Sequence, residues 1–405
     1  MIIDLTDTTS SRINSALVDA RRSSGSPAVG MVLTLVIVTD EGNHYDALKA
    51  ASEASHEHPC RILTVIKRPG RTSRARSGAR LDAEVRVGGE AGAGETVLLR
   101  LHGELADHAE SVVLPLLLPD APVVVWWPED APNDPGRDPL GSLAARRITD
   151  AGAAETPLKA LEARARFYSP GDTDLAWTRA TPWRSMLAAA LDQPHTALKS
   201  AVVEGEAGNA TVDLVRLWLS SRLGVPVDRR TAEGNGISRV ALTMDAGELC
   251  LHRTEPSSAV LTMPGQPDRQ VALKERDIAE LMAEELRRLD PDEAYEATLR
   301  HGLELLGSKA AGKAPATETS EGAEGAEGAA APAAGAAPAE APAAEAPAES
   351  DASASADAGR RAGTGAEAEP AKNRRGGRRA GAAGAGETRG SEEPEHAASP
   401  GGGKA

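Results

Sequence analysis

Two unbroken hydrophobic runs dominate the N-terminal half of the chain. Residues 31–38 read MVLTLVIV, and residues 122–128 read PVVVWWP. Neither run alternates with polar residues, and each is too short for a membrane span or a long core helix. Strands that are covered by helices on both faces have this pattern. Both runs are therefore predicted to be central strands of a parallel sheet.

Amphipathic segments alternate with short apolar ones around these two runs. This strand–helix–strand order, with right-handed crossovers, predicts a doubly wound, mainly parallel α/β fold. The expected strands besides the two runs are 61–66, 83–87, 96–102 and a short one at 148–151, and the expected helices are 5–22, one after the loop at 39–44, 105–118, 140–147, 156–168 and 183–192.

The pattern changes after residues 193–194. Here short apolar strands cluster between one helix and two charged helices, which predicts a smaller α+β domain with a mainly antiparallel sheet. The expected strands are 201–204, 237–244, 247–253, 257–263 and 269–274, and the expected helices are 210–224, 276–289 and 292–306. We therefore assign residues 1–193 to the doubly wound domain and residues 194–306 to the α+β domain.

Residues 307–405 differ from both domains. They contain no Leu, Ile, Val, Met or aromatic side chain, only small residues, proline and charges. Such a segment buries too little apolar surface to offset its ordering entropy, so the tail is predicted to be disordered.

Charge and cysteine content narrow the class of protein. The formal net charge of −15 argues against a general nucleic-acid binder. The two cysteines, Cys60 and Cys250, lie in different predicted domains, which fits a reducing compartment. The first residues lack a secretory pattern, and prolines interrupt the longest apolar tract, at 112–127. We expect a cytoplasmic protein that binds neither nucleic acid nor membrane.

No motif for catalysis stands out. The sequence has no HExxH, GxSxG or CxxC motif and no GxGxxG after a strand. His56, His58 and Cys60 lie two residues apart at the expected end of a helix, a spacing that does not put them on one face. No catalytic residue, metal ligand or cofactor is predicted.

A ligand crevice is expected beyond the carboxyl ends of the parallel strands. Asp40, Asn43 and His44 follow the first buried strand and are the candidate crevice residues. Capping of the next helix explains the same polar loop equally well.

Tryptophan is the commonest aromatic residue, with five Trp against three Tyr and one Phe. Trp and Arg dominate the energetics of protein interfaces, although Trp is also highly buried on average. Core packing is thus the competing interpretation. The candidate partner-binding residues are Trp126, Trp127, Trp177, Arg179, Trp183 and Arg184.

Three segments carry a family resemblance: VVVWWP at 123–128, RDPLGSLAARRITD at 137–150 and DLAWTRATPWR at 174–184. Together they resemble the glucose-6-phosphate dehydrogenase assembly proteins of the OpcA family, over roughly residues 1–306. The resemblance implies a non-catalytic protein that binds glucose-6-phosphate dehydrogenase, promotes its active oligomer and raises its activity in the oxidative pentose phosphate pathway.

An alternative of a different class stays open. An enzyme or sensor would bind a sugar phosphate or nucleotide in the crevice near Asp40 and His44, and such a ligand would stabilise the isolated chain without any partner.

Overall fold

The structure is a computed structural model that describes residues 1–24, 30–69, 78–88 and 94–312, with side chains up to residue 306. The described residues belong to one compact unit that contains two sheets. The tail was predicted to begin at residue 307, but the last helix continues as far as Gly312. The rest of the predicted tail, from residue 313 onward, lies outside the described residues.

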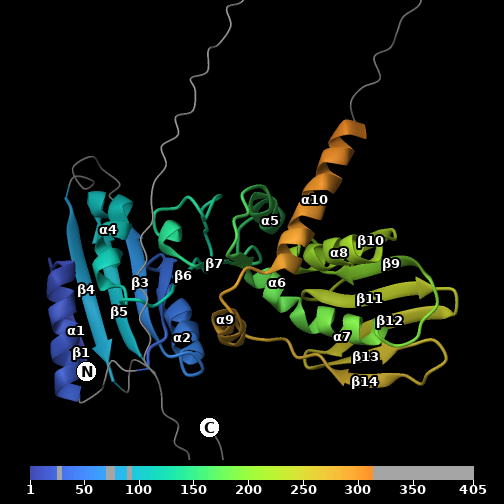
Figure 1. The fold of residues 1–405 in the computed structure, drawn as a ribbon, viewed down its shortest axis with the longest axis horizontal. Coiled ribbons are helices and arrows are strands. Elements are labelled where there is room, and N and C mark those ends of the chain that lie inside the picture. The colour runs from blue at the N-terminus through green and yellow to red at the C-terminus, as the bar shows by residue number, and fades with distance from the viewer. Residues whose placement is uncertain (25–29, 70–77, 89–93, 313–405) are drawn as a thin grey trace, which may run out of the picture. The chain divides into compact units, whose positions relative to one another are not determined.

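Sheet A has eight strands in the order β1-β4-β5-β3-β2-β6-β7-β8 (Figure 1). The neighbouring pairs from β5 to β8 are parallel, while β1 and β4 form an antiparallel edge. This confirms the predicted doubly wound, mainly parallel sheet. The strand bounds are β1 (Ile2–Leu5), β2 (Leu33–Thr39), β3 (Cys60–Arg68), β4 (Arg80–Val87), β5 (Glu95–His102), β6 (Val123–Trp126), β7 (Arg146–Thr149) and β8 (Asp172–Asp174).

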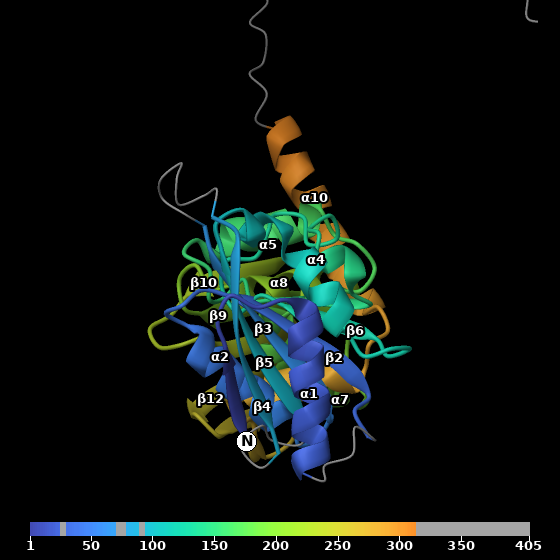
Figure 2. The ribbon, with the colours of Figure 1, turned by 90° about the vertical axis from the view of Figure 1, so that its left-hand side faces the viewer.

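Helices cover both faces of sheet A, which explains why β2 and β6 are apolar without alternation. On one face, α1 (Ser10–Ser24) and α4 (Ala109–Val113) bury Leu17 and Val113 against side chains such as Val36 and Val125. Figure 2 looks onto this side. On the other face, α2 (His44–Ala54) buries Leu48 in a separate cluster.

Sheet B has six strands in the order β10-β9-β11-β12-β13-β14, all antiparallel neighbours except the β9–β10 pair. This confirms the mainly antiparallel second sheet. The helices α7 (Thr181–Leu191) and α8 (Ala210–Leu223) bury Trp183, Leu187 and Val215 against it. The strand bounds are β9 (Leu198–Gly205), β10 (Val227–Thr231), β11 (Ile237–Met244), β12 (Gly247–Glu255), β13 (Ser258–Thr262) and β14 (Arg269–Ala272).

The helix that follows sheet B returns to the first sheet. A capping box of Asp277 and Glu280 starts α9 (Ile278–Arg287), which packs Leu281 and Met282 into the same core cluster as Leu48 of α2. Next, α10 (Glu293–Gly312) packs beside α8 and α5 (Pro157–Arg166). Segments that follow sheet B in the sequence therefore complete the core of sheet A.

Several predicted elements were wrong in detail. Residues 140–147 form a 3₁₀ turn, η3 (Gly141–Leu143), and then β7, not a helix. A Cβ on Gly141 would lie 1.9 Å from the carbonyl oxygen of Pro135, so the chain is pinned in a tight turn there. The predicted helix at 105–118 is divided into η1 (Gly103–His108), α4 and η2 (Leu114–Leu116), since Pro115 cannot continue an α-helix.

Three strands escaped prediction. The sequences of β8, DTD, and β10, VDRRT, carry few apolar side chains, and β1 has only four residues. Within the described residues, none of the helices combines the length and the apolarity that crossing a bilayer requires.

Removing the side chain of Leu281 tests the return of α9 to sheet A. Leu281 is fully buried, so Leu281→Ala should lower the free energy of unfolding by about 2–5 kcal/mol. Leu158, 44% exposed on α5, supplies the matched control, and Leu158→Ala should change the free energy of unfolding by less than about 0.5 kcal/mol. Urea unfolding followed by tryptophan fluorescence measures both, and equal effects would contradict the packing of α9.

Candidate functional site

The predicted crevice lies where the chain crosses from one half of sheet A to the other, beyond β2 and β6. Asp40 follows β2, and its Oδ1 accepts hydrogen bonds from the N–H groups of Gly42 and Asn43 at 2.7 and 2.9 Å. Asn43 Nδ2 donates to Glu129 Oε2, in the loop after β6, at 2.7 Å. The structure thus brings Asp40 and Asn43 together and adds Glu129, which the sequence did not single out.

His44 is buried in the first turn of α2, where its ring lies beside Tyr45. Its Nδ1 lies 2.9 Å from the carbonyl oxygen of Glu41, so this nitrogen carries the proton. Close by, burial and the charge of Asp40 raise the pKa of Glu129. Arg68 of β3 and Arg100 of β5 pair with Glu41 in the same loop, so this end of sheet A carries charges of both signs.

The four candidate tryptophans are all interior residues, none more than 3% exposed. Strand alternation puts Trp126 in the cluster beneath α2 and Trp127 in the cluster beneath α1 and α4. Trp183 packs on sheet B, while Trp177 packs with Tyr295 of α10. None of the four presents its ring at the surface, and partner contact by these rings stays a prediction.

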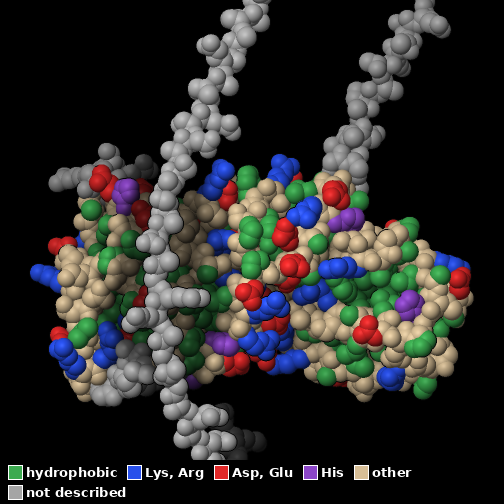
Figure 3. Space-filling model, viewed as in Figure 1, with side chains coloured by type: hydrophobic (Ala, Val, Ile, Leu, Met, Phe, Trp, Pro, Cys, Tyr) green, Lys and Arg blue, Asp and Glu red, His purple; other side chains and the backbone are tan. Residues whose placement is uncertain are grey.

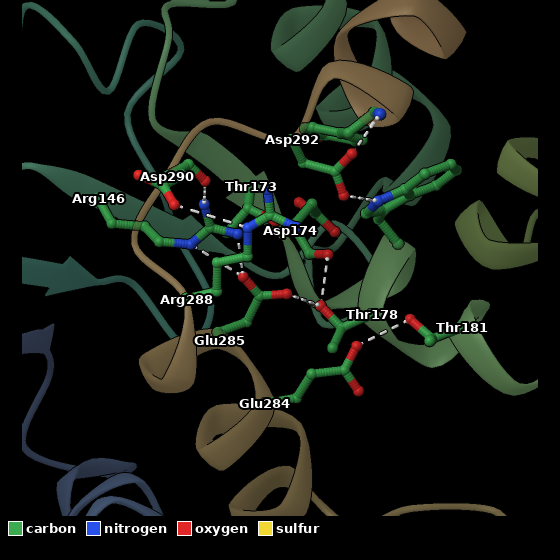
Figure 4. A network of polar contacts seen from close by, with 12 residues as sticks. Arg146, Thr173, Asp174, Thr178, Thr181, Glu284, Glu285, Arg288, Asp290 and Asp292 are labelled. Carbon is green, nitrogen blue, oxygen red and sulfur yellow. Dashed lines mark hydrogen bonds and ion pairs between the residues drawn. The ribbon is translucent and has the colours of Figure 1, made fainter. Parts of the chain in front are cut away.

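A network of polar contacts joins β7 to α9 (Figure 4). Arg146 donates from Nε and Nη2 to Glu285 Oε2 at 3.0 and 2.5 Å, and from Nη1 to the carbonyl oxygen of Asp290 at 2.8 Å. The other carboxylate oxygen of Glu285 accepts from Thr178 Oγ1 at 2.6 Å. Both charged side chains are buried, and every hydrogen bond is charge-assisted.

Trp177 and Arg184 extend the network. On α6 (Leu175–Arg179), Trp177 Nε1 donates to Asp292 Oδ2 at 2.7 Å, while Asp292 Oδ1 caps the first turn of α10 through Ala294 and Tyr295 N–H. The guanidinium carbon of Arg184 lies 3.6 Å from the centre of the Trp177 ring, a cation–π contact. Burial lowers the pKa of Arg184 to about 10.

Arg179 is held by a carboxylate rather than left open. It donates from Nη1 and Nη2 to the two oxygens of Asp150, both at 2.7 Å. Asp150 lies beside Asp174, a fully buried carboxyl at the end of β8 that accepts hydrogen bonds from Thr149 Oγ1 and the N–H groups of Ala151 and Ala176. Burial first, and the charge of Asp150 second, raise the pKa of Asp174 to about 6.

The sequence reasoning missed the carboxylate half of this network. Glu285 and Asp292 were absorbed into charged helices, and Asp174 lies in a strand without apolar residues. One signal was available: RRITD at 146–150 puts two arginines beside a strand, where a buried strand needs carboxylates to neutralise them. Arg146 and Arg147 are both buried, and Arg147 pairs with Asp172.

The arrangement is suited to holding segments together. The carboxylates of Glu285, Asp150 and Asp292 are occupied by hydrogen bonds from within the chain. In the described part of the chain, no group of three His, Cys, Asp or Glu side chains is placed to hold a metal ion. The network therefore fixes α6, α9 and α10 against β7 and β8.

Breaking the Arg146–Glu285 pair should be costly. Glu285→Ala leaves a buried guanidinium without its carboxylate and should lower the free energy of unfolding by about 3–5 kcal/mol. Glu304, 69% exposed, provides the control, and Glu304→Ala should change the free energy of unfolding by less than about 0.5 kcal/mol. Denaturant unfolding measures both. Replacing both partners, Arg146→Met with Glu285→Leu, should recover much of the loss, and a small effect of Glu285→Ala alone would contradict this role.

Asp174 should impose a pH dependence on stability. Because its folded pKa is about 6, above the ordinary value of 3.8, the folded state holds this proton between those pH values while the unfolded state has lost it. The contribution of Asp174 is therefore most favourable below pH 3.8 and declines as pH rises towards 6. Asp174→Asn keeps an acceptor for the backbone N–H groups and removes the titration.

The measurement compares unfolding free energies of the Asp174→Asn variant and the unmodified chain. As the pH rises from about 4 to about 7, the free energy of unfolding of the variant should increase by on the order of 1–3 kcal/mol relative to that of the unmodified chain, since one pKa unit corresponds to about 1.4 kcal/mol. A difference that does not change with pH would show that Asp174 titrates normally.

Two models of known protein families match the sequence. The family model described as glucose-6-phosphate dehydrogenase subunit N-terminal domain matches residues 51–166, and the corresponding C-terminal domain model matches residues 170–299. The "Putative OxPP cycle protein OpcA" of Synechocystis sp. is 30% identical over 140 residues, which cover 32% of this chain and 29% of the relative. That match thus spans less than a third of the relative's length.

Solved structures with a similar course of the chain include oxidoreductases. KijD10, a 3-ketoreductase from Actinomadura kijaniata, is 13% identical with a TM-score of 0.39 and covers 66% of this chain and 94% of its own. Biliverdin reductase from Synechocystis sp. is 10% identical with a TM-score of 0.33 and covers 69% and 98%. Both TM-scores lie below 0.5, so neither likeness bears on the chemistry of this chain. The two family models together match more than half of the sequence, and the chain belongs to the OpcA family, described as glucose-6-phosphate dehydrogenase subunits.

Proposed function

We propose that the chain is a non-catalytic assembly factor and allosteric activator of glucose-6-phosphate dehydrogenase, acting in the oxidative pentose phosphate pathway of the cytoplasm. Membership of the OpcA family carries this proposal, because both family descriptions name a subunit of that dehydrogenase. The name of the Synechocystis relative, an OxPP cycle protein, agrees with it.

The geometry of the described residues supports a binding role. Beyond β2 and β6, the side chain of Asn43 is bound to Glu129, and Arg68 and Arg100 are paired with Glu41. The carboxylates of the β7–α9 network are occupied by arginines and backbone N–H groups. Side chains engaged in this way position elements and leave little capacity for proton transfer.

Among the candidate partner-binding residues, the two arginines are the ones with accessible atoms. Arg179 is 32% exposed and Arg184 is partly buried, whereas the four tryptophans are interior. Within the described residues, Arg184 has no carboxylate within 4 Å and donates only to Thr181 Oγ1, at 3.1 Å. We propose that Arg184 donates hydrogen bonds to a carboxylate of the partner, while its contact with the Trp177 ring keeps the guanidinium in place.

An activator works only if it prefers one state of its target. The chain must bind the active form of the dehydrogenase more tightly than the inactive form, since equal affinity for both would shift nothing. A preference of about 1–3 kcal/mol gives about 5- to 150-fold coupling. A buried interfacial arginine contributes on this scale. Figure 3 shows acidic and basic side chains interleaved over α6 and α9, a surface that suits a charged partner.

The decisive experiment mixes the purified chain with glucose-6-phosphate dehydrogenase and follows NADP⁺ reduction and sedimentation. The expected result is a faster rate and a larger dehydrogenase species. Arg184→Ala should raise the chain concentration needed for half-maximal activation by about 10-fold or more, whereas Arg137→Ala, at an 89% exposed side chain, should leave it unchanged.

The outcomes separate the proposals. An unchanged rate and size with the unmodified chain would overturn the activator proposal. Normal activation by Arg184→Ala would overturn only the role of that arginine. Stabilisation of the isolated chain by a nucleotide or sugar phosphate that disappears in Asn43→Ala would support the alternative, a ligand-binding enzyme or sensor that uses the crevice beyond β2.

A further inference from the structure

A polar cavity of about 460 Å³ lies away from the predicted crevice, between the N-terminus of α8, the end of α6 and the segment that links β14 to α9. Its volume falls in the range of small-molecule sites. Charged residues of both signs line it: Asp150, Arg179, Glu206, Arg253, Lys274, Glu275 and Arg276.

The four cations reach the cavity from three different elements, and three of them have a carboxylate partner. Arg179 is bound by Asp150, Lys274 Nζ lies 2.5 Å from Glu280 Oε1, and Arg276 pairs with Glu284. Arg253, on β12, is different. Within the described residues no carboxylate oxygen lies within 4 Å of it, and its Nη1 donates to the carbonyl oxygen of Pro256 at 2.9 Å.

Arg253 is also held in place and partly removed from water. Its guanidinium carbon lies 5.4 Å from the centre of the Trp183 ring, and Trp183 itself lines the cavity. Burial lowers the pKa of Arg253, and the charge of Glu275 opposes that shift without forming an ion pair within 4 Å. A partly desolvated cation without a directly bound carboxylate is unfavourable, and an anion bound at the guanidinium relieves that penalty.

The opposite wall offers acceptors in a fixed geometry. Glu206 Oε2 accepts from Asn209 Nδ2 at 2.9 Å and from Gly236 N–H at 3.2 Å, which ties the β9–α8 loop to the β10–β11 loop. A Cβ on Gly205 would lie 2.3 Å from the carbonyl oxygen of Gly236, so the two loops approach as closely as glycine allows. Carboxylates on such a wall accept hydrogen bonds from hydroxyl groups.

We propose that this cavity binds a small polyhydroxylated anion, a phosphorylated or carboxylated sugar. The anionic group is bound by Arg253, with Lys274 beside it, and the hydroxyl groups donate to Glu206. A guanidinium that has no carboxylate within 4 Å in the described part of the chain, together with a fixed carboxylate, matches a ligand that carries both an anion and hydroxyl groups. The inference goes beyond activation of the dehydrogenase, because it concerns the isolated chain.

Calorimetry and thermal unfolding of the purified chain test the site without any dehydrogenase present. The probes are glucose 6-phosphate, gluconate and, as the neutral comparison, glucose, each at millimolar concentration. At least one of the two anions should bind saturably and raise the melting temperature, and glucose should bind at least 10-fold more weakly. Whichever anion binds more tightly identifies the preferred anionic group.

Substitutions locate the binding. Arg253→Gln should lower the affinity for the anion at least 10-fold, and Lys274→Gln should lower it by a smaller factor. The Arg137→Gln variant should bind the anion with unchanged affinity. Asn43→Ala, in the crevice beyond β2, should also bind normally. Absence of saturable binding by both anions, or unchanged binding in a folded Arg253→Gln variant, would overturn the proposal. Because the dehydrogenase is absent, neither result affects the proposed activation.

Discussion

The buried ion pair between Arg146 and Glu285 is the contact on which the rest of the arrangement depends. It joins β7 of sheet A to α9, a helix that the chain reaches only after completing sheet B. Neither charge is stable inside the protein without the other, and a buried pair contributes more to specificity of position than to net stability. Apolar contacts of Leu281 and Met282 with α2 supply the favourable burial, whereas the ion pair determines where along β7 the helix settles.

Residue types that are typical of interfaces are used here to build the interior. The chain has a single Phe and three Tyr, so its five Trp supply most of the large aromatic surface available to the cores. Trp177 illustrates the consequence. Its ring packs beside Tyr295, its Nε1 binds Asp292, and its face carries Arg184. An indole engaged on three sides positions other groups, and the partly buried guanidinium of Arg184 is one of them.

The spacing of apolar residues in the sequence predicts the strands and helices that bury apolar side chains. The runs at β2 and β6 do not alternate with polar residues, which predicts the doubly wound sheet, and the short strands clustered after residue 194 predict the antiparallel second sheet. The hydrophobic pattern does not predict a buried strand in which charged residues take the place of apolar ones. β7 and β8 are buried strands made of RRIT and DTD, and they are stabilised by Arg147–Asp172 and by hydrogen bonds to Asp174. No single-segment pattern reveals such strands, because their partners lie on other elements.

The same limit applies to the site, and it explains why the proposed ligand cavity was not visible in the sequence. Its residues come from α6, β12, the β9–α8 loop and the β14–α9 segment, and each looks like an ordinary surface charge by itself. What distinguishes Arg253 from Arg179 and Arg276 is the distance to the nearest carboxylate, a property of the folded chain. The β14–α9 segment also leads directly into α9. A ligand that engages Lys274 would therefore contact the segment that leads into α9, the helix held to β7 by Arg146.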